Sequence, residues 1–502
     1  MIYAKLTFYC ILICLVLTSP TTTDFSELNL ADLIDENSSE CSNLNPLKMR
    51  AGETIYIPHN STFPYSIPAN FNCTYLFIVP IGEYLRMSVI NSLVGKDYIE
   101  FRDSLKYTQK ITTTAIANEE LFSTTGTGHI SIRTFNGGNS KTLLKLEWLK
   151  MPRSKSTLSL EKNANGKFVD CGVLQKYPIT FKAVDVNETL AVSVAHSGYI
   201  LDKFESFFIF DGPNTDSKVV GRMSDHTVVP FISSSRYVTI VGFSRLIVFS
   251  DILVNYESNI KKYRKYNSGV IIDQQGAIFD SINQTVAVTF IAKDGVELYI
   301  TKLTFNEVEN ENCTMTVISG TPSPISRDLV KYTTLSPLPK CFPQQFPAPL
   351  FTIELTDCSI YIVVSKNTPE NFYNITTDRI GYAFTASYLE PSLSSQLDFT
   401  LSSNQSLTYS TTVESVEVVN DEKLTINVYS HSGKSQMSMV VTGNQTGGGA
   451  DAVGTSVNIR FNGTHGTGSA KIRYAIGKSA PGRLRDSWTS AAATVVLLSL
   501  IV

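Results

Sequence analysis

The chain has 502 residues and a formal net charge of −3, with 42 lysines and arginines against 45 aspartates and glutamates. This balance, without a long basic run, excludes nucleic acid as an expected partner. The apolar fraction of 43% is sufficient for true cores, and the length accommodates roughly three or four domains of about 100–150 residues.

The amino terminus has the features of a secretory signal peptide. A single charge, Lys5, precedes a largely apolar run from Leu6 to Leu17, and small polar residues follow. We therefore expect residues 1–23 to be removed, with cleavage around Ser19 to Thr23. This signal predicts a mature chain outside the cell.

The body of the chain predicts β-structure. Helical periodicity is nearly absent, and short alternating segments rich in Val, Ile, Thr, Tyr and Phe are separated by Gly, Pro, Asn and Ser. Strands of this length with frequent turns indicate an all-β chain of tandem antiparallel sandwiches. Examples are Tyr75–Val79, Tyr98–Phe101, Ile130–Thr134, Leu190–Val194, Phe207–Phe210, Tyr237–Val241 and Val286–Phe290.

Self-comparison indicates an internal repeat. The matched segments are Asp97–Asp103 with Glu205–Asp211, His129–Phe135 with Tyr237–Phe243, Asn187–Val194 with Asn283–Phe290, and Phe208–Gly212 with Thr316–Gly320. A fainter fourth copy includes Lys423–Tyr429 and Ala470–Tyr474. Polar stretches near 151–169, 257–267 and 389–397 separate the copies. The basic run Lys261–Lys265 falls in the second stretch, and we interpret it as a solvated linker.

The carboxyl terminus predicts a lipid anchor. Residues Ala491–Val502 are apolar and uncharged, but a helix needs about 20 residues to span a bilayer. A polar spacer, Arg483–Ser490, and small residues precede this tail, which is the order of a glycosylphosphatidylinositol (GPI) attachment signal. We expect attachment at Ser479, or alternatively at Gly477, with removal of 480–502. The alternative interpretation is a C-terminal core strand.

Cysteines and glycosylation sequons agree with an extracellular chain. An even number of cysteines remains after the signal peptide, and none has CxxC spacing, which favours disulfides over zinc. These are Cys41, Cys73, Cys171, Cys313, Cys341 and Cys358. Sequons are spread along the mature chain and indicate exposed loops and strand edges of a glycoprotein. They are Asn37, Asn60, Asn72, Asn187, Asn283, Asn312, Asn374, Asn404, Asn444 and Asn462.

Three motifs resemble the CUB family, and more narrowly its divergent CUB-like members expanded in nematodes. Asn72–Gly82 resembles the opening strand, where a cysteine precedes an aromatic, alternating apolars and Pro-x-Gly. Asp97–Asp103 resembles the Asp-Tyr-x-Glu-x-x-Asp strand, and Phe208–Pro213 resembles the Tyr-Asp-Gly-Pro turn. The resemblance is strong over roughly 41–256, moderate over 268–389 and weak beyond 395.

The resemblance implies jelly-roll sandwiches and a division of the chain. The expected parts are a signal peptide at 1–23, CUB-like domains at 24–150, 168–257 and 266–389, a divergent fourth at 395–476, and the removed signal at 480–502. It also implies a Cys41–Cys73 bridge and a second bridge from Cys313 to Cys341. Cys171 and Cys358 then remain to pair, although four cysteines allow three connectivities.

Some CUB domains bind calcium through acidic side chains, and two acids match that pattern here. Asp97 and Asp103 occupy matching positions, but the expected upstream glutamate is missing. The alternative is that these acids stabilise turns through hydrogen bonds to backbone N–H groups. Calcium is thus a candidate ion for the first domain, and no other cofactor is expected.

No catalytic constellation stands out. The sequence has no HExxH, GxSxG or P-loop pattern, and the nearby acids Asp202 and Glu205 are weak evidence for acid–base catalysis. We therefore expect a non-enzymatic, GPI-anchored surface glycoprotein that binds an extracellular protein or glycan through its loops. Family resemblance implies a role in innate defence against microbes.

Alternative functions and locations stay open. The chain could be an adhesive coat glycoprotein, or a hydrolase with a cryptic carboxylate site, and it could be secreted rather than anchored. Candidate recognition residues are two pairs of aromatic side chains next to prolines; the alternative is that these side chains pack over the end of a sandwich. These are Phe63 with Tyr65, and Phe342 with Phe346.

Overall fold

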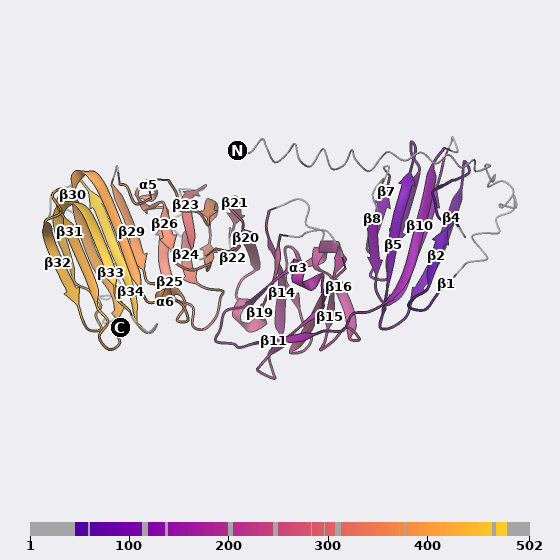
Figure 1. Cartoon of the computed structure of the whole chain (residues 1–502), viewed down its shortest axis with the longest axis horizontal. Coiled ribbons are helices and arrows are strands. Elements are labelled where there is room, and N and C mark those ends of the chain that lie inside the picture. Colours follow the sequence, from indigo (N-terminus) through magenta and orange to yellow (C-terminus); the bar gives the residue numbers. More distant parts are fainter. Residues whose placement is uncertain are drawn as a thin grey trace, which may run out of the picture. The chain divides into compact units, whose positions relative to one another are not determined.

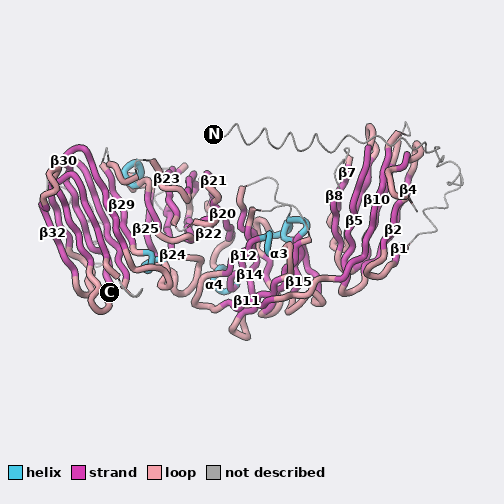
Figure 2. The backbone as a smooth tube through the Cα atoms, in the orientation of Figure 1, coloured by secondary structure: helices cyan, strands magenta, loops and turns pink. Residues whose placement is uncertain are grey.

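The computed structural model describes residues 46–478, apart from 59–60, 113–118, 136–138, 199–203, 244–248, 283, 296, 307–312, 371, 376–377 and 464–467. Strands dominate, and only short helical turns interrupt them (Figures 1 and 2). The expected all-β fold class is therefore confirmed. The helical turns are α3 (Cys171–Leu174), η2 (Phe204–Ser206), η3 (Met223–His226), α4 (Glu257–Ile260), α5 (Leu338–Cys341) and α6 (Ala386–Leu389).

The chain divides into two compact units. The first comprises the described residues up to Pro80 together with Tyr84–Leu149, and the second comprises Ile81–Glu83 and the residues from Lys150 onward. The first unit contains two five-stranded sheets. One has the order β1 (Leu47–Lys48), β4 (Asn72–Val79), β9 (Gly126–Arg133), β6 (Tyr98–Arg102), β7 (Thr108–Ile111). The other has the order β2 (Thr54–Ile57), β10 (Lys141–Lys150), β5 (Glu83–Ser92), β8 (Glu119–Ser123), with β3 (Tyr65–Ser66) pairing β10.

Alternation along these strands explains the core of the first unit. Every second residue of β4 and β5 is buried, so each sheet turns one apolar face inward. Phe77 and Phe101 stack in this core with ring centroids 5.7 Å apart. Trp148 is fully buried, and its Nε1 donates to the carbonyl oxygen of Ile78 at 3.0 Å. The indole N–H is therefore satisfied inside the core.

The second unit contains four sheets. A five-stranded sheet has the order β11 (Ser156–Leu160), β13 (Ile179–Ala183), β18 (Tyr237–Gly242), β15 (Phe207–Asp211), β16 (Lys218–Arg222). A nine-stranded sheet has the order β12 (Lys167–Asp170), β19 (Asp251–Tyr256), β14 (Leu190–His196), β20 (Lys265–Ile271), β22 (Thr285–Ala292), β27 (Leu350–Thr356), β24 (Thr314–Ser319), β25 (Asp328–Thr333), with β17 (Phe231–Ile232) pairing β14. A four-stranded sheet has the order β21 (Gln274–Asp280), β28 (Ser359–Ser365), β23 (Leu298–Phe305), β26 (Gln344–Phe346).

One strand pattern occurs three times in these sheets. The orders β1-β4-β9-β6-β7, β11-β13-β18-β15-β16 and β20-β22-β27-β24-β25 are equivalent, and in each the first two strands run parallel. The sequence match of Phe208–Gly212 with Thr316–Gly320 places β15 and β24 at the same position of this pattern. The match of Asn187–Val194 with Asn283–Phe290 joins strands at different positions of the pattern. The first segment contains β14 and the second contains β22, but β22 occupies the position of β13.

Strand β20 joins the second and third copies of the pattern. Its residues Ser268 and Gly269 pair in parallel with β14, while its other edge pairs with β22. The stretch 257–267 is therefore not a solvated linker, since it forms α4 and starts β20. Tyr263, within the basic run, is only 7% exposed, and its hydroxyl donates to Glu354. The nine-stranded sheet therefore continues from β14 to β20 across the expected boundary between 257 and 266.

An ion cluster also connects these two copies. Asp170 and Asp251 are directly opposite each other on β12 and β19, a placement that is unfavourable for two like charges. Lys293 follows β22, and its Nζ donates hydrogen bonds to Asp170 Oδ2 and, at 2.9 Å, to Asp251 Oδ1. The lysine from the third copy therefore compensates the facing carboxylates of the second.

The last sheet is six-stranded and differs from the repeated pattern. Its order is β29 (Arg379–Phe384), β34 (Ser469–Gly477), β30 (Leu397–Glu417), β33 (Gly449–Phe461), β31 (Leu424–Tyr429), β32 (Ser435–Val441). The strand β29 lies in the stretch expected for the third domain but belongs to this sheet. Gln344 of β26 donates to the Tyr382 carbonyl at 2.8 Å and accepts from its N–H at 2.9 Å. The expected division into four domains stays a prediction.

Candidate binding site at the loop end of the first unit

One buried carboxylate joins two loops of the first unit. Asp97 is 5% exposed and lies just before β6. Its Oδ1 accepts from the backbone N–H of Phe135 at 2.7 Å, and its Oδ2 accepts from the hydroxyl of Ser140 at 2.5 Å. The Ser140 hydroxyl oxygen in turn accepts from the N–H of Val94 at 2.9 Å. The loop 93–97 is thereby tied to both ends of the loop 134–140.

Thr134 ties the third loop to the same place. Its hydroxyl accepts from the N–H of Phe71 at 2.8 Å and donates to the carbonyl oxygen of Pro68 at 2.5 Å. The N–H of Ile67 donates to the carbonyl oxygen of Ser140 at 2.8 Å. We refer to Asp97, Thr134 and Ser140 as the loop hub. All three are at most 5% exposed, so their hydrogen bonds are shielded from water.

Apolar side chains stand exposed around the loop hub. Phe63 is 64% exposed, Val94 53% and Phe135 45%. Phe63 stacks on the half-buried Tyr65 with ring centroids 6.2 Å apart. Exposed aromatic side chains on loops held by a rigid scaffold are typical of recognition surfaces. The sequence singled out Phe63 and Tyr65, but it missed Val94 and Phe135.

The acids considered for calcium are separated by a strand. Asp97 and Asp103 lie on either side of β6, and six extended residue steps place their Cα atoms about 20 Å apart. Asp103 Oδ1 accepts from the N–H groups of Leu105 and Tyr107 at 2.9 and 2.8 Å, while Asp97 belongs to the loop hub. Calcium needs oxygen ligands within about 2.6 Å, so these two residues do not fit one ion.

Of the second pair of aromatic candidates, one is exposed to a hollow and one is not. Phe342 lines a hollow of about 490 Å³ that is bounded by β23 and α5. Phe346 is fully buried and packs against Phe351 and Phe384, so its expected role in recognition is wrong. A second, polar hollow of about 260 Å³ is lined by Lys262 and Glu354, among others, and these two form an ion pair.

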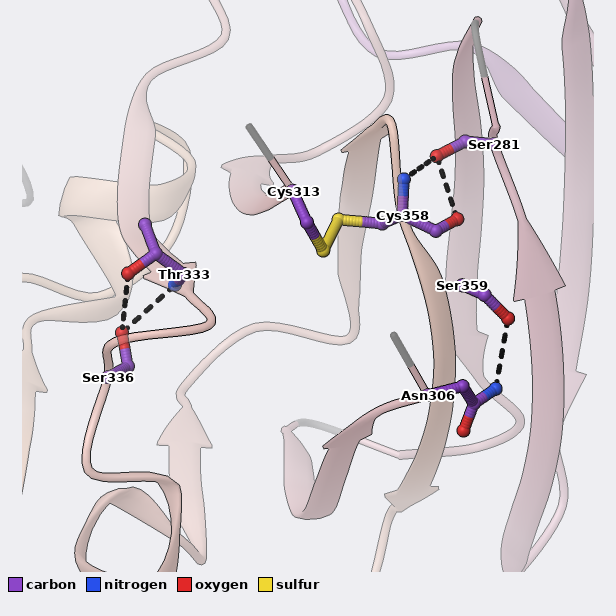
Figure 3. Close-up of a disulfide and its surroundings, with 7 residues drawn as sticks. All are labelled: Ser281, Asn306, Cys313, Thr333, Ser336, Cys358 and Ser359. Carbon is purple, nitrogen blue, oxygen red and sulfur yellow. Dashed lines mark hydrogen bonds between the residues drawn. A yellow bond between two sulfur atoms is a disulfide. The ribbon is translucent and has the colours of Figure 1, made fainter. Parts of the chain in front are cut away.

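The disulfides differ from the expected pairing. Cys313 bonds Cys358, with Cα atoms 4.7 Å apart, and not Cys341 (Figure 3). Thr314 and Thr356 face each other on β24 and β27. This pairing brings Cys313, just before Thr314, close to Cys358, two residues after Thr356. Cys171 and Cys341 are buried thiols, and burial raises the pKa of Cys341 to about 11. Cys73 is disulfide-bonded, and its expected partner Cys41 lies outside the described residues.

The hydrogen bonds around this disulfide tie the turn to its neighbours. Cys358 N–H donates to the hydroxyl of Ser281 at 2.9 Å, and that hydroxyl donates to the Cys358 carbonyl oxygen at 3.0 Å (Figure 3). The side-chain amide of Asn306 donates to Ser359 at 3.0 Å. The turn between β27 and β28 is therefore fixed by both covalent and polar contacts.

The described sequon asparagines are all exposed, as a glycan acceptor must be. These are Asn72, Asn187, Asn374, Asn404, Asn444 and Asn462. Their glycosylation stays a prediction, as it does for Asn37, Asn60, Asn283 and Asn312, which lie outside the described residues. Of the two residues expected for anchor attachment, Ser479 lies outside the described residues and Gly477 is the buried last residue of β34.

The acids considered for catalysis are not brought together in a described site. Asp202 lies outside the described residues, and Glu205 is part of η2. Among the described ranges, no three His, Cys, Asp or Glu side chains form a group that could hold a metal ion. In the same ranges, no helix has the length and apolar character needed to cross a membrane.

An ion cluster on the second sheet shapes the electrostatics of the first unit. Glu147 of β10 lies 2.8 Å from Arg86 Nη2 and 2.8 Å from Lys145 Nζ. Burial alone would raise the pKa of Glu147, but hydrogen bonds from Lys145 and Arg86 lower it below its ordinary value. The carboxylate is therefore held ionised at neutral pH.

Comparisons with known proteins agree with this β architecture. Residues 36–152 match the model of the CUB-like domain. Domains of this kind are generally extracellular, non-catalytic modules that bind proteins. No curated protein sequence matches the chain.

Solved structures give matches with low identity. The CUB1-EGF-CUB2 domain of human MASP-1/3 is 10% identical, covering 40% of this chain and 97% of that chain at a TM-score of 0.17. The same domains of rat MASP-1 are 9% identical, covering 42% and 100% at 0.18. The full extracellular region of zebrafish Gpr126/Adgrg6 is 7% identical, covering 89% and 54% at 0.19. At such TM-scores these similarities carry no argument about function. It is the family model that identifies a CUB-like domain at residues 36–152 of this chain.

Proposed function

We propose that the chain is a GPI-anchored surface glycoprotein that binds an extracellular protein or glycan through the loop end of its first unit. The observation that carries this proposal is the loop hub, which fixes three loops and leaves Phe63, Val94 and Phe135 exposed. Preorganised loops lose little conformational entropy on binding, so exposed aromatic side chains on them contribute affinity efficiently.

The fixed loops need no metal ion for their arrangement. The carboxylate of Asp97 bonds Phe135 and Ser140 directly, which replaces the bridging that a bound cation would supply between loops. Binding by this loop end is therefore expected to continue in the presence of a calcium chelator.

The anchor and the defence role rest on the sequence. Attachment at Ser479 is favoured over Gly477, because Gly477 is buried and paired with Thr408 in the last sheet. Ser479 follows this strand by two residues, so the anchor would hold the six-stranded sheet close to the membrane. A role in innate defence follows from the resemblance to CUB-like proteins alone.

One experiment tests surface display and binding together. The full chain is expressed on animal cells, released with phosphatidylinositol-specific phospholipase C, and applied to arrays of glycans and immobilised extracellular proteins. We expect release by the lipase and binding that is reduced in the double variant Phe63→Ser/Phe135→Ser.

A matched control separates loss of recognition from loss of apolar surface in general. Val440 is 56% exposed on β32, so Val440→Ser removes one exposed apolar side chain from another sheet. Binding that is equal in the Phe63→Ser/Phe135→Ser variant and the wild type would contradict the proposed site. Protein present in the medium before lipase treatment would contradict the anchor.

A further inference from the structure

Two cations and two aromatic rings meet on the outer face of the first sheet. Tyr98 and Phe135 lie with ring centroids 6.5 Å apart at 37°. Lys110 Nζ is 3.7 Å from the centroid of the Tyr98 ring. Arg133 is directly opposite Tyr98 on the neighbouring strand β9. We call these four residues the aromatic–basic corner.

The strand register explains why these side chains share one face. Side chains alternate along a strand, and the inward positions of β6 are Ile99 and Phe101, which are fully buried. Tyr98 therefore points outward, as does Arg133 opposite it. Lys110 on β7 reaches Tyr98 from the other side. The two cations thus flank one ring, and two strand spacings separate their strands by about 10 Å.

The cations of the corner are open to a ligand. Lys110 and Arg133 are both exposed, and neither forms an ion pair with another described residue. Glu100, which is half-buried, is opposite Lys110, while Lys96 and Lys141 are further exposed cations near the loop hub. The local charge is therefore positive, although the whole chain is slightly negative.

From this arrangement we propose that the aromatic–basic corner binds an acidic saccharide. The C–H face of a pyranose ring packs on an exposed aromatic ring through dispersion contacts, and carboxylate or sulfate groups on the sugar accept hydrogen bonds from Arg and Lys. The inference rests on the proposed function and names a ligand class for it.

A saccharide fits this surface better than an acidic peptide. Peptide side chains gain affinity by filling pockets, whereas the corner is an open sheet face. The rings of Tyr98 and Phe135 can each stack on one sugar ring of a chain, while Lys110 and Arg133 bind the acidic groups of those sugars. Binding energy then comes from flat stacking and from separate charge contacts.

The test measures binding of three defined probes to the lipase-released full chain. The probes are a hyaluronan hexasaccharide, the neutral chitohexaose and a hexaglutamate peptide. We expect the hyaluronan hexasaccharide to bind at least about tenfold more tightly than the other two, because one charge-assisted hydrogen bond exceeds 1.4 kcal/mol, a factor of ten.

Substitutions locate the binding. Arg133→Gln should lower the affinity at least about tenfold, since it removes such a hydrogen bond. Phe135→Leu should lower it by a factor of a few, while Phe135→Tyr keeps the ring and should bind like the wild type. Lys331→Gln, at an exposed position of β25, removes an equal charge elsewhere and should have no effect.

A glycan on Asn72 would stand beside the corner, because Asn72 is opposite Arg133. Each variant is therefore also measured with Asn72→Gln, where that glycan cannot form. Equal losses in Arg133→Gln and Lys331→Gln would overturn the proposal, as would unchanged binding in Arg133→Gln. Tighter binding of hexaglutamate would assign the surface to an acidic peptide instead.

The outcome is distinguishable from failure of the proposed function. If arrays show a ligand that depends on Phe63 while no acidic saccharide binds, the proposed function stands and this inference is wrong. If an acidic saccharide binds through Arg133 while Phe63→Ser changes the binding of no ligand, the proposed ligand class is correct. The recognition surface is then the sheet face and not the loops.

Discussion

Removing the carboxylate of the loop hub should loosen the loops 93–97 and 134–140. In Asp97→Ala, the N–H of Phe135 and the hydroxyl of Ser140 lose the charged acceptor that they share. Hydrogen bonds to charged groups contribute about 1.5–3 kcal/mol each, so local opening of these loops should become about 3 kcal/mol or more easier. The loops should then open about 100-fold more often.

Amide hydrogen exchange is the suitable assay because it reports local opening in a chain of several cores. The N–H groups of Val94 and Phe135 should exchange about 100-fold faster in Asp97→Ala, while amides in β4 keep their wild-type rates. Asp103→Asn is the matched control: the amide oxygen of Asn can still accept from Leu105 and Tyr107. Wild-type exchange rates at Phe135 in Asp97→Ala would refute the role of the loop hub.

Three further results are expected. The first unit should lose stability as the pH falls through the ordinary range of glutamate ionisation, because the lowered pKa of Glu147 means that the folded state is stabilised only while this carboxylate is ionised. Glu147→Gln should flatten this part of the pH–stability curve measured by urea unfolding. A non-reducing peptide map should contain the Cys313–Cys358 bridge. An alkylating agent should label Cys341 only after denaturation, since this residue is 8% exposed. Labelling of Cys341 in the native chain would contradict its burial. Lys293→Met should lower the stability of the nine-stranded sheet by about 2 kcal/mol, because Asp170 and Asp251 then face each other without a cation. Replacing one of these two aspartates by asparagine in the same chain should restore part of that loss. Equal stability of the wild type and Lys293→Met would show that the ion cluster does not stabilise the sheet.

Local patterns in the sequence predict the strands and part of the repeat. Alternation predicted β4, β6 and β9 because one face of each strand is buried. The match of Phe208–Gly212 with Thr316–Gly320 correctly placed β15 and β24 at equivalent positions of the sheet pattern. These inferences succeeded because they depend on the period of side chains along a single strand.

Properties that depend on strand pairing were harder to infer. The partner of Cys313 follows from the register of β24 with β27, which the spacing of cysteines does not contain. The basic run Lys261–Lys265 looked like a linker because its charges are exposed, yet Tyr263 within it is buried. Sequence composition reports which side chains face water, and not whether the backbone between them joins a sheet.

The candidate site shows the same limit. The sequence indicates Asp97 as a candidate calcium ligand or turn-stabilising acid, but its partner Ser140 lies far along the chain and carries no motif of its own. Phe135 lies at the end of a matched segment, directly after the expected strand Ile130–Thr134, and the Asn-Gly-Gly that follows it indicates a loop. A pair of acids separated by an extended five-residue strand could have been excluded as joint calcium ligands from strand geometry alone.

The sharing of β20 has a consequence for how the chain would unfold and evolve. A strand paired on both edges belongs to two copies of the repeat at the same time, so neither copy can separate without breaking a ladder of the other. Unfolding of either copy would expose a free parallel edge on its neighbour, and such edges recruit other chains. Selection therefore acts on both copies together: insertions or recombination breakpoints between them should be tolerated far less than those near residue 150, where the chain passes from one unit to the next.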